Sequence, residues 1–263
     1  MKKRPRLYFS FRSPYSWLAV HRLRAEVPDL FAQVDWFPYW DPDEKTNAAL
    51  AERGAEMHYV QMSRAKHRYL LVDTKRLAQR AGLPMAWPID VDPWWDLPHL
   101  AWLLARRAGR AVPFYDALVA ARWERGEDIC TPEVVARAAV EAGIDPVAAQ
   151  NAPQDETLRA EGVDCLAAAY DDDIFGIPYL RVGRHRFWGL DRVDHFLAEW
   201  RPESTPTPEA SPAVPTVVRD GAAVPAAVRD GAAVPAAVLD GAAVPAAVLD
   251  GAAFDTDTAG GCG

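Results

Sequence analysis

The chain has 263 residues, half of them hydrophobic and a quarter charged, which is the balance of one large or two small globular domains. Its formal net charge of -8 argues against a nucleic-acid ligand, because neutralising phosphates needs clustered Lys and Arg. It has no apolar run of about 18 residues and no signal-peptide pattern at its start, so we expect no membrane span and a cytoplasmic location.

The residues up to 201 predict alternating strands and helices. We expect a strand over 6–11, a helix over 13–27 and a second strand over 34–39. A mostly helical stretch follows from about 56 to 168, interrupted by Pro and Gly. A hairpin over 179–182 and 185–187 and a last helix over 191–200 complete the pattern. This order predicts an α/β domain, 1–201, with a thioredoxin-like fold and a large helical insertion.

The composition changes abruptly after residue 201. Residues 202–215 are rich in Pro, Thr, Ser and Glu, as is typical of a linker, and a ten-residue unit then repeats from Val218, Val228, Val238 and Val248. Each unit carries a Pro and a Gly and has only small side chains to bury. We therefore expect 202–263 to be a disordered tail, with an interaction or processing tail as the alternative.

The chain contains three cysteines, and none forms a CxxC pair. An odd count without metal-ligand spacing argues against a disulfide framework and against a zinc site, so we expect no metal. Cys130 and Cys165 are expected to be small buried residues, and Cys262 lies in the tail.

The first strand-to-helix turn is a candidate binding site. Ser13 stands in the N-cap position and Pro14 at the first helical position, where its missing N–H costs nothing. The positive end of the helix dipole stabilises a nearby anion, and a thiolate is one candidate. On this feature alone, an ordinary helix cap is the favoured explanation of Ser13.

A second candidate region lies at the other end of the domain. The Ile177-Pro178 bond, between a Gly turn and a strand, is placed where a cis bond would present the backbone of Ile177 outward to a peptide-like ligand. Leu190 and Asp191 begin the last helix, so its N–H groups and the carboxylate can clamp a zwitterion. The alternative is that Asp191 caps the helix.

These stretches, in this order, resemble the 2-hydroxychromene-2-carboxylate isomerases and kappa-class glutathione transferases, which belong to the DsbA-like family. The resemblance covers about residues 6–200 and is carried by 8–19, 175–178, 187–192 and the Lys66-His67-Arg68-Tyr69 run with Asp73 and Arg76. It implies a site for glutathione or another low-molecular-weight thiol.

The resemblance also implies roles for single residues. Ser13 would stand where the oxidoreductases of the family carry their first cysteine, and would hydrogen-bond the glutathione sulfur. Ile177 would pair its backbone with the cysteinyl part beside cis-Pro178. The Leu190 N–H and Asp191 would hold the γ-glutamyl end.

Four further residues are assigned to the site. Lys66 would reach the glycine carboxylate or an acidic substrate, and Tyr15 and Asn47 would contact the substrate. Trp94 would line an aromatic pocket or pack the helical insertion.

Serines at positions 13 and 16 leave the turn without a sulfur nucleophile, so disulfide exchange is disfavoured. The resemblance implies a glutathione-dependent isomerase that acts by thiolate addition and elimination on a conjugated acid. A kappa-type transferase or reductase acting on electrophiles, and a non-catalytic interaction module, are the alternatives. The expected partners are a small-molecule substrate and, as an open option, a second copy of the chain, without nucleic acid or membrane.

Overall fold

The computed structural model describes residues 4–58 and 62–200. The predictions for the tail, 202–263, and for Cys262 fall outside these residues. No helix within the described ranges is long and apolar enough to cross a membrane.

A four-stranded sheet with the order β2-β1-β3-β4 forms the centre of the domain. Strand β1 (Arg6–Phe9) pairs in parallel with β2 (Asp35–Pro38) and antiparallel with β3 (Tyr179–Val182), which continues into β4 (His185–Trp188). The predicted β-α-β, helical block, β-β-α order is confirmed. Because β3 runs against β1, the start of β3 lies at the same edge of the sheet as the end of β1, which brings residues 10–13 next to 176–178.

The strand register places helices on both faces of the sheet. Leu7, Leu180 and Phe187 share one face, where Phe187 contacts Phe196 of α10 (Val193–Trp200). On the other face, the Tyr8 hydroxyl donates to an Asp172 carboxylate oxygen at 2.6 Å, just beyond the end of α9 (Glu156–Asp171). Helix α10 therefore covers one face of the sheet, and the end of α9 lies over the other.

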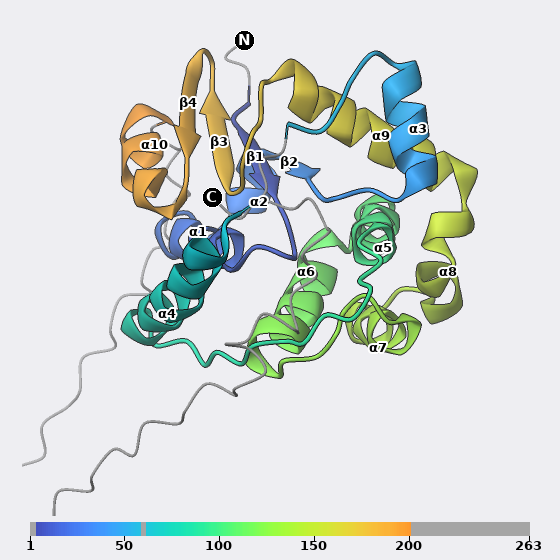
Figure 1. Cartoon of the computed structure of the whole chain (residues 1–263), viewed down its shortest axis with the longest axis horizontal. Coiled ribbons are helices and arrows are strands. Elements are labelled where there is room, and N and C mark those ends of the chain that lie inside the picture. The colour runs from blue at the N-terminus through green and yellow to red at the C-terminus, as the bar shows by residue number, and fades with distance from the viewer. Residues whose placement is uncertain (1–3, 59–61, 201–263) are drawn as a thin grey trace, which may run out of the picture.

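The helical block lies to one side of the sheet (Figure 1). After α1 (Pro14–Glu26) and the short α2 (Leu30–Gln33), the chain forms α3 (Glu44–Glu52) and α4 (Arg64–Arg80). The helices α5 (Asp96–Arg107), α6 (Ala111–Val119), α7 (Pro132–Ala142) and α8 (Pro146–Gln150) follow, with a π-helical turn, η1 (Ala120–Glu124), and a 3-10 turn, η2 (Ala152–Gln154). A last 3-10 turn, η3 (Leu190–Arg192), leads into α10.

Three boundaries differ from the sequence prediction. The first strand ends at Phe9 rather than at residue 11, because the amides of Ser10 and Phe11 bond to the side chains of Ser16 and His99 instead of a neighbouring strand. Helix α3 begins twelve residues before the predicted helical block, and Asp43 caps it by accepting from Thr46 N–H at 2.8 Å. The last helix begins as a 3-10 turn, because Gly189 at φ +96° reverses the chain there.

The core is rich in aromatic side chains. Phe9 makes edge contacts with Trp36, Trp102 and Tyr115, which joins the sheet to α5 and α6. Cys130 and Cys165 are buried free thiols, as predicted, and burial raises the pKa of Cys165 to about 11. Neither thiol is in the thiolate form that a nucleophile requires.

Candidate functional site

Ser13 caps the first turn of α1, as predicted. Its Oγ accepts from the Ser16 N–H at 3.2 Å, and Pro14 occupies the first helical position. The hydroxyl also reaches the carbonyl oxygen of Ile177 at 3.5 Å, which is the outer limit of a hydrogen bond. Ser13 therefore joins the two candidate regions across the edge of the sheet, through a weak contact that a stronger acceptor can replace.

The Ile177-Pro178 peptide bond is cis. Ile177 is only 1% exposed and its carbonyl is directed at Ser13, whereas the sequence led us to expect its backbone to face outward. Two close contacts hold the segment that contains Ile177. Ser13 lies against its carbonyl, and the Trp188 ring lies so close to Gly176 that a Cβ there would come within 2.5 Å of the indole Nε1.

The turn after β4 is tied to the cis-proline. The Gly189 N–H donates to the Pro178 carbonyl oxygen at 2.9 Å, and this bond places Leu190 and Asp191 beside the Ser13 turn. Leu190 is half-buried, and the Asp191 side chain is largely exposed and paired with Arg192 at 2.8 Å. The first N–H of such a turn has no acceptor within its own helix, so Leu190 is positioned to donate to a ligand.

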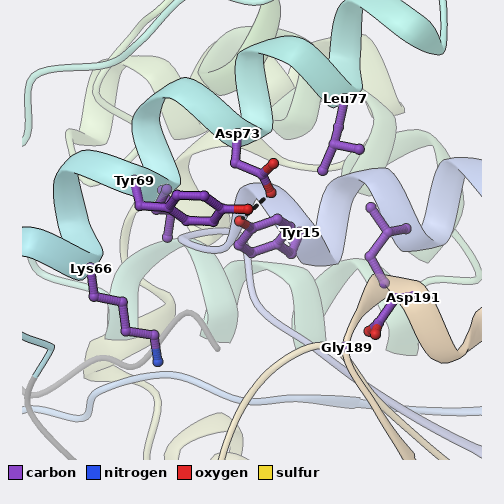
Figure 2. A pocket seen from close by; sticks show the side chains of 9 residues that line it. Tyr15, Lys66, Tyr69, Asp73, Leu77, Gly189 and Asp191 are labelled. Atoms are coloured by element: carbon purple, nitrogen blue, oxygen red, sulfur yellow. Dashed lines mark hydrogen bonds between the residues drawn. The ribbon is translucent and has the colours of Figure 1, made fainter.

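A cavity of about 410 Å³ lies between α1, α4 and the η3 turn. This volume is in the range of small-molecule pockets, roughly 300–1,000 Å³. The walls are formed by Tyr15, Lys66, Tyr69, Leu70, Asp73, Leu77, Gly189, Leu190 and Asp191 (Figure 2). Four of the predicted site residues, Tyr15, Lys66, Leu190 and Asp191, therefore line one cavity. Ser13 precedes Tyr15 by two residues, and Pro178 accepts a hydrogen bond from Gly189, so the Ser13 turn and the cis-proline adjoin this cavity.

The α4 wall of the cavity could have been found from the sequence. The residues of this wall follow Lys66 at intervals of three, four, seven and eleven, which places them on one face of a helix. They are Tyr69, Leu70, Asp73 and Leu77. The resemblance drew attention to the run from Lys66 to Tyr69 and to Asp73 and Arg76, but not to Leu70 and Leu77. The periodicity extends the run over three turns and predicts a continuous surface.

Tyr15 is fixed in the cavity by a polar contact. Its hydroxyl donates to an Asp73 carboxylate oxygen at 2.8 Å (Figure 2). Arg76 pairs with the other oxygen of Asp73. The hydroxyl proton of Tyr15 is therefore directed at Asp73, on the α4 wall of the cavity.

Charges of opposite sign stand at the two ends of the cavity. Figure 2 shows Lys66 at one end and Asp191 at the other, with Tyr15 and Asp73 between them. Burial, together with the positive charges of Arg12 and Lys66, lowers the pKa of His67 next to this region. A ligand that spans the cavity is therefore best matched by a carboxylate at the Lys66 end and an ammonium at the Asp191 end.

The structure does not bring Asn47 and Trp94 into this cavity. Asn47 is exposed on α3, which packs on α9 far from α4 (Figure 1). The Trp94 indole N–H donates to an Asp43 carboxylate oxygen at 3.1 Å, so Trp94 packs the start of α3 within the helical block. In the described ranges, no group of His, Cys, Asp and Glu side chains is arranged to hold a metal ion.

Comparisons with known proteins find relatives that match most of the chain. The protein named 2-hydroxychromene-2-carboxylate isomerase from Sphingobium xenophagum is 26% identical over 199 residues, which is 74% of this chain and 96% of the relative. A protein of the same name from Pseudomonas putida is 23% identical and covers 71% of this chain and 88% of its own length.

Solved structures show the same fold. The 2-hydroxychromene-2-carboxylate isomerase structure matches with a TM-score of 0.58 at 21% identity, over 75% of this chain and 94% of that chain. The cytosolic disulfide reductase DsbM from Pseudomonas aeruginosa with GSH matches with a TM-score of 0.51 at 17% identity, over 75% and 96%. The family model of the DSBA-like thioredoxin domain matches residues 6–200, and the chain belongs to that family.

Proposed function

We propose that this protein is a glutathione-dependent isomerase that acts on an aromatic-derived, conjugated acid. The observation that carries the proposal is the position of Ser13. It caps a helix, contacts Ile177 beside a cis-proline, and stands next to a cavity with Lys66 and Asp191 at its ends. The names of the two curated relatives support the reaction class.

The cavity fits a small peptide thiol. Glutathione carries two carboxylates, one ammonium and one thiol, and the cavity has a cation at one end and an anion at the other. Lys66 would hold the glycine carboxylate, while the Leu190 N–H and Asp191 would hold the carboxylate and ammonium of the γ-glutamyl end. The apolar walls, Leu70 and Leu77, would cover the aliphatic part of the peptide.

Bound glutathione would supply the sulfur nucleophile that the turn lacks, since serines occupy positions 13 and 16. The Ser13 hydroxyl would donate a hydrogen bond to this sulfur, in place of its 3.5 Å contact with the Ile177 carbonyl oxygen. The N-terminal end of α1 adds its positive dipole at the same place. Both interactions favour the thiolate over the thiol and thereby lower the thiol pKa.

The binding part of the proposal is tested by titrating the protein with glutathione and following Trp fluorescence. S-methylglutathione is the matched probe, because it keeps both carboxylates and the ammonium but has no thiol. We expect both peptides to bind and glutathione to bind more tightly. If neither peptide binds at millimolar concentration, the glutathione proposal is wrong.

The reaction class is tested by a substrate assay. With 2-hydroxychromene-2-carboxylate or a related conjugated acid, we expect isomerisation that requires glutathione but does not consume it. Consumption of glutathione with formation of a stable conjugate would assign the protein to the transferases instead. Because Asn47 and Trp94 lie outside the cavity, a panel of acids with differently substituted rings is the appropriate substrate set.

A further inference from the structure

His99 is a buried residue in the first turn of α5, outside the cavity, and is 0% exposed. One ring nitrogen, Nδ1, lies 2.7 Å from the backbone carbonyl oxygen of Trp95. The other, Nε2, lies 3.3 Å from the backbone nitrogen of Phe11. A carbonyl can only accept and a backbone N–H can only donate, so both contacts are satisfied only when Nδ1 carries the proton and Nε2 accepts from Phe11.

The surroundings hold the ring in this one orientation. The His99 ring stacks on Trp40, with centroids 5.1 Å apart and an interplanar angle of 11°. Phe11 covers it with its own ring at 5.2 Å. Burial, together with the nearby positive charge of Arg122, lowers the pKa of His99 to about 3, so the ring is neutral at ordinary pH. Because the ring is neutral and held in one orientation, Nε2 remains the acceptor for the Phe11 N–H.

Phe11 belongs to the loop that carries Ser13. Three other bonds organise that loop from within: the Ser16 Oγ accepts from Ser10 N–H at 3.2 Å, the Ser10 Oγ accepts from Arg12 N–H at 3.3 Å, and the Ser10 carbonyl oxygen accepts from Ser13 N–H at 3.3 Å. The bond from Phe11 to His99 joins the loop to the helical insertion, 88 residues further along the chain. The same loop also packs on the insertion through the Phe11 and Tyr115 rings, 5.5 Å apart, and through the Arg12 guanidinium, 5.7 Å from the Trp95 ring. Of these contacts, the bond to His99 is the one that holds a backbone amide of the loop.

We propose that His99 is a positioning residue for the thiol site. By accepting the Phe11 N–H, it holds the loop 10–13 so that the Ser13 hydroxyl stands against the Ile177 carbonyl, where the sulfur is to be received. The inference rests on the proposed function, because it assigns to the loop the task of orienting Ser13 toward a bound thiol. His99 itself does not line the cavity and acts through Phe11.

Two amide variants separate the two contacts of the ring. In His99→Gln, the side-chain oxygen can reach the position of Nε2 and accept from Phe11. In His99→Asn, the amide nitrogen replaces Nδ1 toward Trp95, but nothing reaches Phe11. Both replacements are neutral and remove the aromatic stack with Trp40. Thermal unfolding measures the loss of stability that the two variants share. Any difference between the two variants then reports the hydrogen bond to Phe11, which is the contact that orients Ser13.

The readout is the pKa of bound glutathione, followed by thiolate absorbance, together with kcat and KM for the conjugated acid. We expect His99→Asn to raise the bound-thiol pKa and to lower kcat about fivefold, as the loss of one hydrogen bond implies, with KM unchanged. His99→Gln should stay within about twofold of the wild-type protein in kcat. Equal thiol pKa values in wild type and both variants, with lower stability alone, would overturn the inference.

A readout without ligand separates this inference from the proposed function. Amide hydrogen exchange over residues 10–16 should be faster in His99→Asn than in His99→Gln. If the wild-type protein fails to bind glutathione, the proposed function is wrong, and this exchange difference still decides whether His99 holds the loop. Equal exchange in the two variants would refute the positioning role, whether or not glutathione binds.

Discussion

Gly176→Ala perturbs the site without removing any group that would contact a ligand. The new Cβ would lie 2.5 Å from Nε1 and 3.0 Å from Cε2 of Trp188. Ordinary contacts between such atoms are about 3.5 Å, so the indole must move by about 1 Å. The Trp188 side chain is 39% exposed and lies on an edge strand, so it can move outward.

The expected cost is that of moderate overpacking, about 1–3 kcal/mol, which lowers Tm by roughly 3–9 °C for a domain of this size. Trp188 directly precedes the turn that carries Leu190 and Asp191, so its displacement should shift the γ-glutamyl end of the site. We expect glutathione affinity to fall about tenfold, equivalent to one charge-assisted hydrogen bond.

Gly183→Ala is the matched control. Gly183 has φ +58° and open space around the position of a Cβ, so the substitution strains the backbone without a clash. It lies in the β3–β4 turn, at the opposite end of these strands from the site. Thermal unfolding should show a loss for both variants, and the glutathione titration should show a loss for Gly176→Ala alone. Wild-type Tm and affinity in Gly176→Ala would refute the packing argument.

Three further substitutions test the charges. Burial raises the pKa of Asp96 to about 6. Its contribution to the free energy of unfolding is therefore complete below the unfolded-state pKa near 4 and is lost as pH rises through 6. In urea titrations, the wild-type protein should lose stability between pH 4.5 and pH 7, and Asp96→Asn should remove this pH-dependent loss. Arg122→Met removes both 2.8 Å hydrogen bonds to Asp90. Burial alone would raise the pKa of the Asp90 carboxyl, but Arg122 holds that pKa below its usual value. The substitution should therefore lower the free energy of unfolding by about 3 kcal/mol at neutral pH in the same assay. Lys66→Met should weaken glutathione binding about two- to fivefold, in a salt-dependent way, as isothermal titration at two ionic strengths would show.

The features that the sequence predicts correctly are local. The Ser13 cap and its Pro14 neighbour are set within four residues, and the order of strands and helices follows from the hydrophobic period and the Gly and Pro positions. The cis bond at Pro178 and the grouping of Lys66, Leu190 and Asp191 came from the family resemblance and depend on strand pairing that a single sequence does not display.

The features that the sequence does not predict depend on long-range packing. Ile177 is buried, its carbonyl lies 3.5 Å from the Ser13 hydroxyl, and its neighbour Gly176 lies against the Trp188 ring; the residues around Ile177 in the sequence reveal neither contact. His99 meets Phe11 across 88 residues. Trp94 packs the cap of α3 through Asp43, so the structure decides for packing between the two roles that the sequence left open.

The measurement that tests the central claim most directly is the pKa of glutathione bound to the wild-type protein, to Ser13→Ala and to Ser63→Ala. Ser63 caps α4 as Ser13 caps α1, accepting from Lys66 N–H at 3.3 Å, so both variants lose a helix cap worth about 1 kcal/mol. We expect a bound-thiol pKa below that of free glutathione in the wild-type protein and in Ser63→Ala, and a return toward the free value in Ser13→Ala. A thiol pKa that is equally depressed in Ser13→Ala would contradict the role assigned to this serine.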